Sequence, residues 1–222
     1  MTDPVATPAR TILIVDDHPM MRRGLRELLS HEPDLQVTGE AVEAQEALCL
    51  IESLPPDLVL VDISLRQSNG LDLIKRVRAK YPEIRMLVIS MHDEAIYADR
   101  ALYAGALGYI SKQETPEKVL EAVRLVLRGD IYLSPEMTAQ RLMRITPRER
   151  RVLQSAVEKL SDRELEVFEA IGVGRKTREI ADQLYVSVKT IETHRESIKR
   201  KLGLRGNIEL IQRSCRWVFE EK

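Results

Sequence analysis

Five polar residues that follow short apolar runs are the first candidates for chemistry. They are Asp16, Asp17, Asp62, Ser90 and Lys112. Carboxylates that lie close together repel one another unless a cation neutralises them, and an all-oxygen set with open positions suits Mg²⁺. A carboxylate can also attack phosphorus as a nucleophile, while a lysine and a metal ion stabilise the phosphoryl oxygens. Taken alone, an aspartate after a strand is more often a turn former or a helix cap, and Ser90 a satisfied loop hydroxyl, but the set together predicts a phosphoryl-transfer site.

The elements that would position these residues alternate along residues 11–128. Runs rich in β-branched residues predict strands at 11–16, 35–39, 57–62, 85–90 and 107–111, and amphipathic stretches predict helices at 19–30, 43–54, 71–80, 94–104 and 116–128. Strands that are apolar throughout are typical of a parallel sheet covered on both faces. We therefore predict an α/β fold, a doubly wound five-stranded parallel sheet. With the strand order 2-1-3-4-5, Asp16, Asp17 and Asp62 converge on one crevice.

The composition indicates a soluble protein of one ordinary domain and one small one, with 44% hydrophobic and 31% charged residues in a chain of 222. No apolar run is long enough to cross a bilayer, so a membrane protein is not expected. Residues 1–10 resemble a disordered leader without the apolar part of a signal peptide, which favours a cytoplasmic protein. Cys49 and Cys215 lie far apart in apolar helical patterns, so we expect two small buried side chains and no disulfide.

The charge of the chain is unevenly distributed. Residues 1–135 carry 15 Lys and Arg against 21 Asp and Glu, whereas residues 136–222 carry 19 against 14. A basic C-terminal part favours nucleic acid as a partner, although a charge of this size also fits an ordinary solvated surface. Beyond Gly129 strand signals end and the pattern is helical. We place a linker with a helical segment at 129–159 and a small all-α domain at 160–222.

Two predicted helices of this second domain, 177–184 and 188–202, are joined by a three-residue turn, which is typical of a helix-turn-helix. The apolar stripe of the second helix consists of Val188, Ile191, Ile198 and Leu202, with His194 on or beside it. The candidates for DNA contact on its other faces are Lys189, Thr190, Glu192, Thr193, Glu196, Lys199 and Lys201. Since every amphipathic helix has a polar face, ordinary solvation is the competing interpretation.

The order of the five polar residues is also that of a known family. Residues 11–128 resemble the receiver domain of response regulators, which has a flavodoxin-like fold. The resemblance implies that Asp62 is the phosphoacceptor and that Ser90 and Lys112 bind the phosphoryl group. It also implies a Mg²⁺ site, whose ligands would be Asp16, Asp17, Asp62 and the backbone carbonyl of Ser64.

Three further residues near this site gain an interpretation from the same resemblance. Tyr109 would be the aromatic that changes rotamer on activation, and the alternative is a half-buried strand aromatic. Gln113 stands where many receivers have proline, so no cis peptide is expected there. His92 could tune dephosphorylation, although we expect a solvent-exposed loop histidine.

Residues 160–204 resemble the DNA-binding domain of LuxR/FixJ (NarL-like) response regulators. The matching motifs are Arg163-Glu164, Glu179-Ile180-Ala181, Thr190-Ile191, His194 and Lys201-Leu202-Gly203. The resemblance implies a two-component transcription regulator: a sensor histidine kinase phosphorylates Asp62, and this controls homodimerisation and binding to promoter DNA. Family helices often carry lysine where Glu192 stands, so base selection could rely on Glu192 accepting from cytosine, or on Thr193. The last helix, at 206–219, would form a dimer surface or simply pack against the other helices.

Two other functions are compatible with the same residues. The acidic crevice could belong to a Mg²⁺-dependent phosphohydrolase, although that leaves the helix-turn-helix unused. Alternatively, the receiver could regulate a protein partner while DNA binding is independent of phosphate. The regulator hypothesis uses both halves, and it expects no enzymatic activity other than self-phosphorylation and self-dephosphorylation of Asp62.

Overall fold

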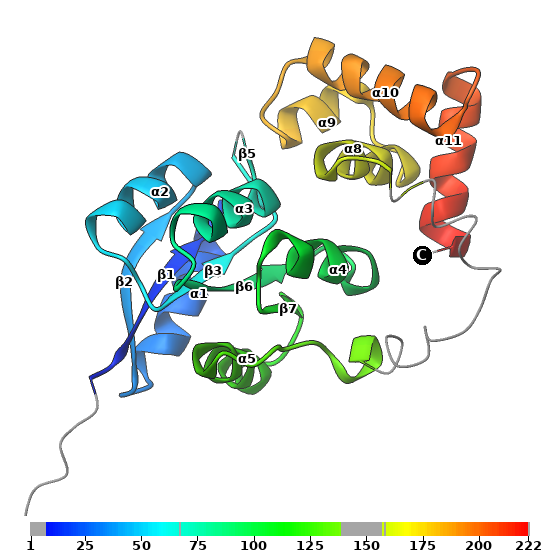
Figure 1. The fold of residues 1–222 in the computed structure, drawn as a ribbon. Helices are drawn as coiled ribbons and strands as arrows, with labels where there is room; N and C mark the ends of the chain where they lie inside the picture. Colours follow the sequence, from blue (N-terminus) through cyan, green and yellow to red (C-terminus); the bar gives the residue numbers. More distant parts are fainter. Residues whose placement is uncertain (1–7, 67, 139–156, 158, 222) are drawn as a thin grey trace, which may run out of the picture. The chain divides into compact units, whose positions relative to one another are not determined.

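The chain divides into two compact units, residues 1–138 and residues 139–222. The computed structural model describes residues 8–66, 68–138, 157 and 159–221 (Figure 1). Most of the linker predicted at 129–159 lies outside the described residues. Within the described ranges, no helix has both the length and the apolar character needed to cross a membrane.

The first unit contains a parallel sheet of five strands in the order β2-β1-β3-β6-β7, which is the doubly wound arrangement predicted from the sequence. The strands are β1 (Arg10–Val15), β2 (Leu35–Ala41), β3 (Leu58–Val61), β6 (Arg85–Ser90) and β7 (Gly108–Ser111). The central strand β3 and its neighbour β6 are buried almost throughout, because helices cover both faces of the sheet. Both strands end directly at candidate site residues.

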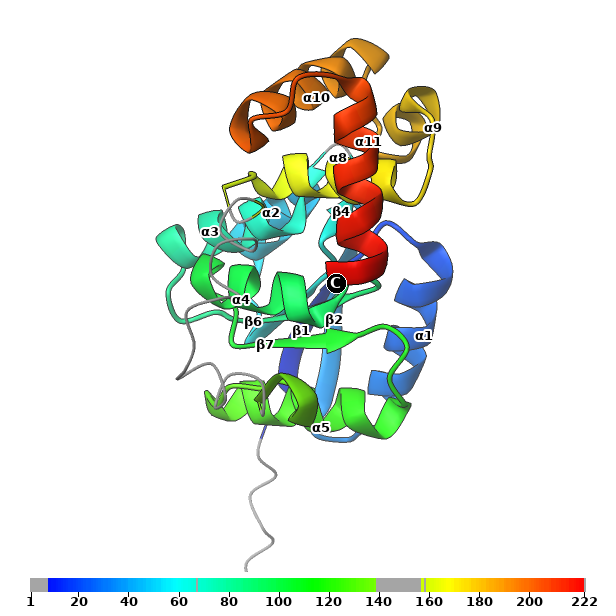
Figure 2. The same cartoon turned by 90° about the vertical axis from the view of Figure 1, so that its right-hand side faces the viewer.

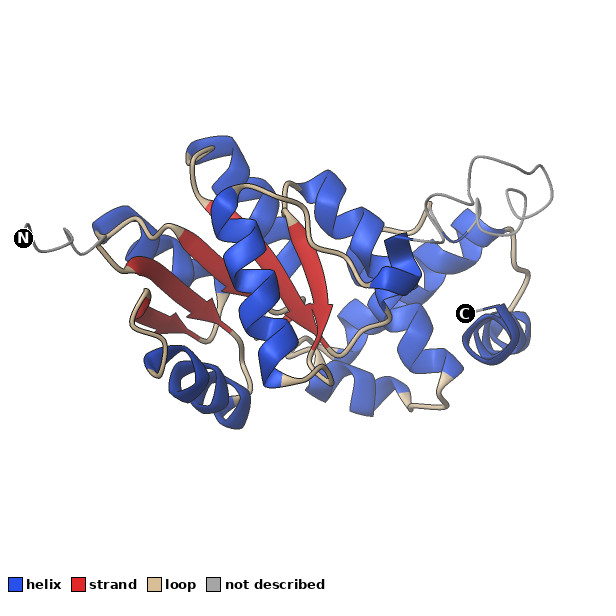
Figure 3. Ribbon diagram, turned by 90° about the horizontal axis from the view of Figure 1, so that it is seen from below, coloured by secondary structure: helices blue, strands red, loops and turns tan. Residues whose placement is uncertain are grey.

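Five helices flank this sheet, as Figures 1 and 3 show. They are α1 (Pro19–Ser30), α2 (Ala44–Ser53), α3 (Gly70–Lys80), α4 (Glu94–Ala104) and α5 (Pro116–Arg128). Their observed ends lie within one residue of the predicted ones. Asn69 and Asp93 cap α3 and α4 by accepting backbone N–H groups, which is the usual role of these residue types at a helix start.

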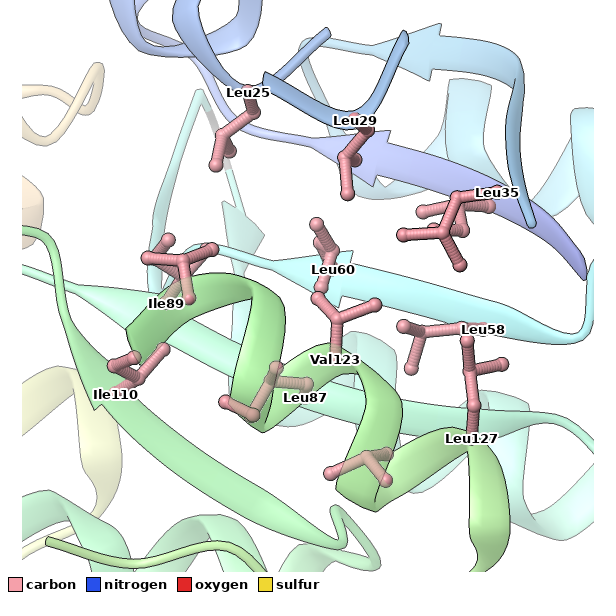
Figure 4. Packing of buried hydrophobic residues seen from close by; sticks show 14 of the residues in the cluster. Leu25, Leu29, Leu35, Leu58, Leu60, Leu87, Ile89, Ile110, Val123 and Leu127 are labelled. Carbon is pink, nitrogen blue, oxygen red and sulfur yellow. The ribbon is translucent and has the colours of Figure 1, made fainter. Parts of the chain in front are cut away.

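One core of the unit lies between the sheet and helices α1 and α5 (Figure 4). Alternate strand residues such as Ile12, Leu60 and Leu87 point to this face, where Leu29 of α1 and Val123 of α5 are fully buried. Burial of each such side chain stabilises the unit by roughly 1.5–3 kcal/mol. The strand ends are thus held on a well-packed base.

The first unit departs from the sequence prediction in three places. A two-residue hairpin, β4 (Ser64–Leu65) with β5 (Ser68–Asn69), follows β3 and is too short to give a sequence pattern. Tyr132 forms an isolated bridge to Gly108 at the sheet edge, in a region beyond Gly129-Asp130 where the sequence predicted no further strand pairing. Cys49 is exposed, and the prediction of a buried side chain there is wrong because α2 turns Ala44, Ala47 and Ile51 to the core instead.

The second unit is helical in its described part. Its elements are α8 (Asp162–Gly172), α9 (Thr177–Gln183), α10 (Val188–Leu202), α11 (Asn207–Arg216) and a final turn of π-helix, η1 (Trp217–Glu221). Helix α8 lies against both α10 and α11, as Figure 2 shows. The rings of Phe168 and Trp217 lie 5.6 Å apart between centroids, and Ile191 and Ile198 of α10 are fully buried. Cys215 is partly buried, and both cysteines are free.

Candidate functional sites

Three carboxylates meet at the carboxyl ends of β1 and β3. Asp16 and Asp17 follow β1, and Asp62 follows β3, which is paired in parallel with β1. The Asp62 backbone N–H donates to the carbonyl of Val15 at 2.8 Å, so the ladder continues to the acidic residue itself. Ligand atoms of the three aspartates and of His18 all lie within 4.8 Å of one another. The convergence predicted from strand order is therefore present.

Lys112, which follows β7, reaches into this cluster. Its Nζ lies 2.7 Å from Asp62 Oδ2 and 2.7 Å from Asp16 Oδ2, and the side chains of all three residues are at most 3% exposed. Burial alone would lower the pKa of Lys112, but the two carboxylates raise it above its ordinary value. Burial raises the pKa of Asp62, which Lys112 opposes and the Asp16 charge reinforces. The site therefore holds a buried cation between two buried anions.

The cluster is compatible with a divalent cation. Asp62 Oδ1 is buried and accepts no hydrogen bond from any residue that the structure describes, which leaves a lone-pair oxygen to bind a further positive charge. Asp16, Asp17 and Asp62 together offer the all-oxygen donor set that hard cations prefer. One ammonium against three carboxylates leaves an excess of negative charge at this edge of the sheet.

Two residues that the sequence analysis did not single out support the acidic loop. His18 Nδ1 lies 2.7 Å from Asp17 Oδ1, and the His18 backbone N–H donates to Asp16 Oδ1 at 2.8 Å. Arg22 donates to the Asp16 carbonyl at 2.7 Å and to Glu40 at 3.3 Å. The position of His18, directly after two aspartates at a strand end, is a sequence signal that could have indicated its role. Nothing in the sequence indicates the role of Arg22.

The loop after Asp62 is closed tightly by Gly70. The Gly70 N–H donates to the Ile63 carbonyl at 2.7 Å. A Cβ at position 70 would lie 2.0 Å from the Asp62 carbonyl oxygen, so any other residue requires backbone movement at the site. The start of α3 is therefore packed directly against the carboxylate-bearing loop.

The remaining candidates of the receiver lie around His92. Ser90 is fully buried at the end of β6, and its hydroxyl lies near enough to Asp62 to favour the ionised carboxylate, although less strongly than burial disfavours it. The Ser64 hydroxyl is hydrogen bonded to His92 Nε2 at 2.9 Å. Tyr109 is fully buried and its hydroxyl donates to the His92 carbonyl at 2.7 Å.

His92 is therefore only partly exposed and contacts three parts of the site. Its ring also lies on Tyr97 of α4, with 4.6 Å between ring centroids. The prediction of a solvent-exposed loop histidine is wrong, because partners far away in sequence surround it. Tyr109 is fully buried, so the alternative of a half-buried strand aromatic does not describe it.

The Lys112–Gln113 peptide is trans, as expected from the absence of proline at position 113.

In the second unit, α9 and α10 are joined as a helix-turn-helix. Tyr185 in the turn has φ of 53°, and Ser187 caps α10 by accepting the Thr190 N–H at 3.1 Å. Arg163 of α8 donates to the Leu184 carbonyl at 2.5 Å, which ties the turn to the first helix. The predicted apolar stripe holds at Ile191 and Ile198, but Val188 is 41% exposed and does not belong to the core.

Glu164 of α8 is the centre of a buried polar network. Its carboxylate accepts from the Ser161 N–H at 2.7 Å, from Ser197 Oγ at 2.6 Å and from Lys201 Nζ at 2.5 Å. Burial alone would raise the pKa of Glu164, but these donors more than offset it and lower the pKa to about 2. Burial and the charge of Arg163 lower the pKa of His194.

The candidate DNA contacts of α10 differ in what their side chains already bind. Lys201 pairs with buried Glu164 and so lies on the packed side of the helix, which the sequence did not predict. Lys199 pairs with Glu196 at 2.8 Å and donates to Asn207. The hydroxyls of Thr190 and Thr193 bond to Ser187 and to the Lys189 carbonyl, respectively. Lys189 and Glu192 are exposed.

Comparison with known proteins assigns both units to families. The model described as "Response regulator receiver domain" matches residues 12–124, and the model described as "Bacterial regulatory proteins, luxR family" matches residues 158–214. The chain belongs to the LuxR family of response regulators. It is a transcription regulator in which a phosphorylation-dependent receiver controls a DNA-binding helix-turn-helix.

Three proteins illustrate what this LuxR-family regulator is similar to. Oxygen regulatory protein NreC of Staphylococcus carnosus (strain TM300) is 34% identical over 205 residues, covering 90% of this chain and 94% of NreC. A LuxR-family response regulator from Aurantimonas sp. SI85-9A1 has a TM-score of 0.59 and 32% identity, covering 62% of this chain and 99% of that one. RcsB of Salmonella typhimurium has a TM-score of 0.64 and 26% identity, covering 93% and 96%.

Proposed function

We propose that Asp62 is the phosphoacceptor, that a sensor histidine kinase is the donor, and that the phosphorylated protein binds promoter DNA as a homodimer. The observation that carries this proposal is the state of the Asp62 carboxylate. One of its oxygens is bound to Lys112 at 2.7 Å, and the other is buried without a hydrogen bond from the described residues. A nucleophile is thus held in place with one oxygen left for phosphorus.

The chemistry follows from the groups around this oxygen. An Asp62 oxygen attacks phosphorus, the bond from phosphorus to the kinase histidine breaks, and the imidazole leaves with the electron pair, so an acyl phosphate forms. Lys112, with its raised pKa, stays protonated and pairs with a phosphoryl oxygen. The Ser90 hydroxyl donates a hydrogen bond to another phosphoryl oxygen. The same site would self-phosphorylate from small donors and would later admit water for self-dephosphorylation.

The residues that would hold Mg²⁺ are Asp16, Asp17, Asp62 and the Ser64 carbonyl. When bound, the ion would neutralise charge on both the carboxylates and the incoming phosphoryl group. The excess of carboxylates over ammonium supports this assignment. His18 holds Asp17 in place by its 2.7 Å contact and is a positioning residue in this scheme.

The path from phosphoryl group to output starts at His92. Ser90 and Ser64 both bond to this residue, and Tyr109 bonds to its carbonyl, so a shift of either serine changes the packing of Tyr109 beneath α4. Tyr109 is the proposed switch residue. Phosphorylation then alters a surface of the receiver, promotes the dimer and changes DNA affinity.

The proposed division of labour is a receiver at 11–128, a linker at 129–159 and a DNA-binding domain at 160–222, in a cytoplasmic protein. Helix α10 is the recognition helix, with the candidate contacts of its exposed face placed in the major groove. RcsB, a relative of known structure, is described by its DNA interaction, which supports the same role here. Two-fold symmetry would match half-sites about one helical turn apart, or a multiple of it.

Selection of bound fragments from random DNA, with and without acetyl phosphate, tests the proposal. The full-length protein should select one sequence, with higher affinity in the presence of acetyl phosphate, and Asp62→Asn should remove the dependence on acetyl phosphate. Sequence-independent binding unaffected by Asp62→Asn would refute the mechanism. Multiple turnovers of small phosphoesters that Asp62→Asn abolishes would instead favour a phosphohydrolase.

A further inference from the structure

Two side chains on the exposed face of α10 are not engaged with the protein. Within the described part of the chain, neither Lys189 nor Glu192 forms a side-chain hydrogen bond or an ion pair, and both are exposed. Their neighbours differ: Glu196 pairs with Lys199, and Lys201 pairs with Glu164. Glu196 and Lys201 thus have partners within the protein, whereas the Lys189 ammonium and the Glu192 carboxylate are open to a ligand.

We propose that Lys189 and Glu192 together read two neighbouring base pairs, Glu192 by accepting from the N4 amino group of cytosine and Lys189 by donating to guanine. This rests on the proposed placement of α10 in the major groove. Lys189 and Glu192 are the second and fifth residues of the helix, at the N-terminal end that contacts base edges in helix-turn-helix proteins. Three residues along a helix span about 4.5 Å, close to the roughly 3.4 Å between base pairs.

The negative charge of Glu192 limits which bases its side chain can bind. An exposed carboxylate on a helix that approaches DNA is repelled by the phosphates, so it weakens binding wherever it finds no donor. The major-groove edge offers donors only from cytosine N4 and adenine N6, and a carboxylate pairs best with cytosine because adenine also presents the N7 acceptor. Glu192 therefore selects cytosine and penalises the other bases at its position.

Glu196 provides a matched comparison one turn further along α10. It is also an exposed glutamate, but Lys199 Nζ lies 2.8 Å from its carboxylate. The charge of Glu196 is thus neutralised within the protein, and its carboxylate already has a donor in Lys199. Glu196 contributes to the field near DNA and not to the choice of base.

The experiment is selection from random DNA by the full-length protein with acetyl phosphate, for the wild type, Glu192→Gln and Glu196→Gln. Both variants lose one negative charge, so both should bind all DNA more tightly. Only Glu192→Gln should change the preferred base, from cytosine to adenine, which glutamine bonds through N6 and N7. At a fixed site, the wild type should prefer cytosine by about 5- to 150-fold over the other bases at that position.

The outcomes separate this inference from the proposed function. A wild-type protein that selects no sequence at all overturns both. A wild type that selects a defined site, with the same base preferences in Glu192→Gln, overturns the inference alone and reduces Glu192 to a repulsive charge. A loss of cytosine preference in Glu196→Gln would overturn it as well, because the paired glutamate would then be the reading group.

Discussion

The replacement Glu164→Gln should destabilise the DNA-binding unit. It should also weaken the dependence of the unfolding free energy on pH in the acid range. The carboxylate is 6% exposed and accepts from Lys201, Ser197 and the Ser161 N–H, so its charge is held by three donors. Glutamine has the same size as the Glu164 side chain and keeps one acceptor oxygen, but it lacks the negative charge. It leaves the Lys201 ammonium with a weaker partner in a partly buried position.

The magnitude follows from the pKa of Glu164, which is lowered from its ordinary value of 4.5 to about 2. At about 1.4 kcal/mol per pKa unit, this corresponds to about 3 kcal/mol of folding free energy. Because the folded pKa is the lower one, the contribution is complete above about pH 4.5 and is lost as the pH falls through about 2. The variant should lack this pH-dependent part.

The assay uses urea unfolding of the full-length protein, followed by the fluorescence of Trp217. This is the single tryptophan of the sequence; it is 5% exposed and contacts Phe168, so it reports on the second unit. Glu192→Gln is the control, since that side chain is exposed. An unfolding free energy of Glu164→Gln equal to that of the control at pH 7, with the same slope between pH 5 and pH 3, would refute the reasoning.

Three further changes test the receiver. Asp62→Asn should abolish phosphate incorporation from acetyl phosphate, measured by intact-protein mass spectrometry; a retained phosphoprotein would place the acceptor elsewhere. Tyr109→Phe removes the 2.7 Å bond to the His92 carbonyl, so incorporation should persist while the phosphate-dependent gain in DNA affinity, measured by anisotropy, falls by about fivefold. Gly70→Ala should lower the unfolding free energy of the receiver by about 3 kcal/mol in calorimetry, because its Cβ meets the Asp62 carbonyl; an unchanged melting temperature would contradict the tight packing.

The sheet and the acidic crevice were predictable because they depend on local patterns. Apolar runs of β-branched residues predict strands, and parallel strands bring their carboxyl ends to one edge, so the sequence alone places Asp16 and Asp62 together. The length of the amphipathic stretches gave helix ends to within a residue. Caps and first-turn prolines carry this information within a few residues of sequence.

The errors occur where a side chain's partner is far away in sequence. His92 bonds to Ser64, 28 residues earlier, and Lys201 bonds to Glu164, 37 residues earlier. A hydrophobic period shows which face of a helix is buried, but not which lysine of a basic run turns back to a buried acid. Cys49 illustrates a related limit, since its apolar neighbours on α2 face the core while it does not.

Two of the hydrogen bonds at position 92, those with Ser64 and Tyr109, differ in their dependence on the residue type at that position. The bond to Ser64 uses the imidazole, whereas the bond from Tyr109 uses the backbone carbonyl, which every residue type possesses. A substitution at position 92 would therefore remove the bond to Ser64 but keep the acceptor for Tyr109, the proposed switch residue. On this proposal, the route from the phosphoryl group to Tyr109 should tolerate a change of side chain at position 92, whereas the contact with Ser64 should not.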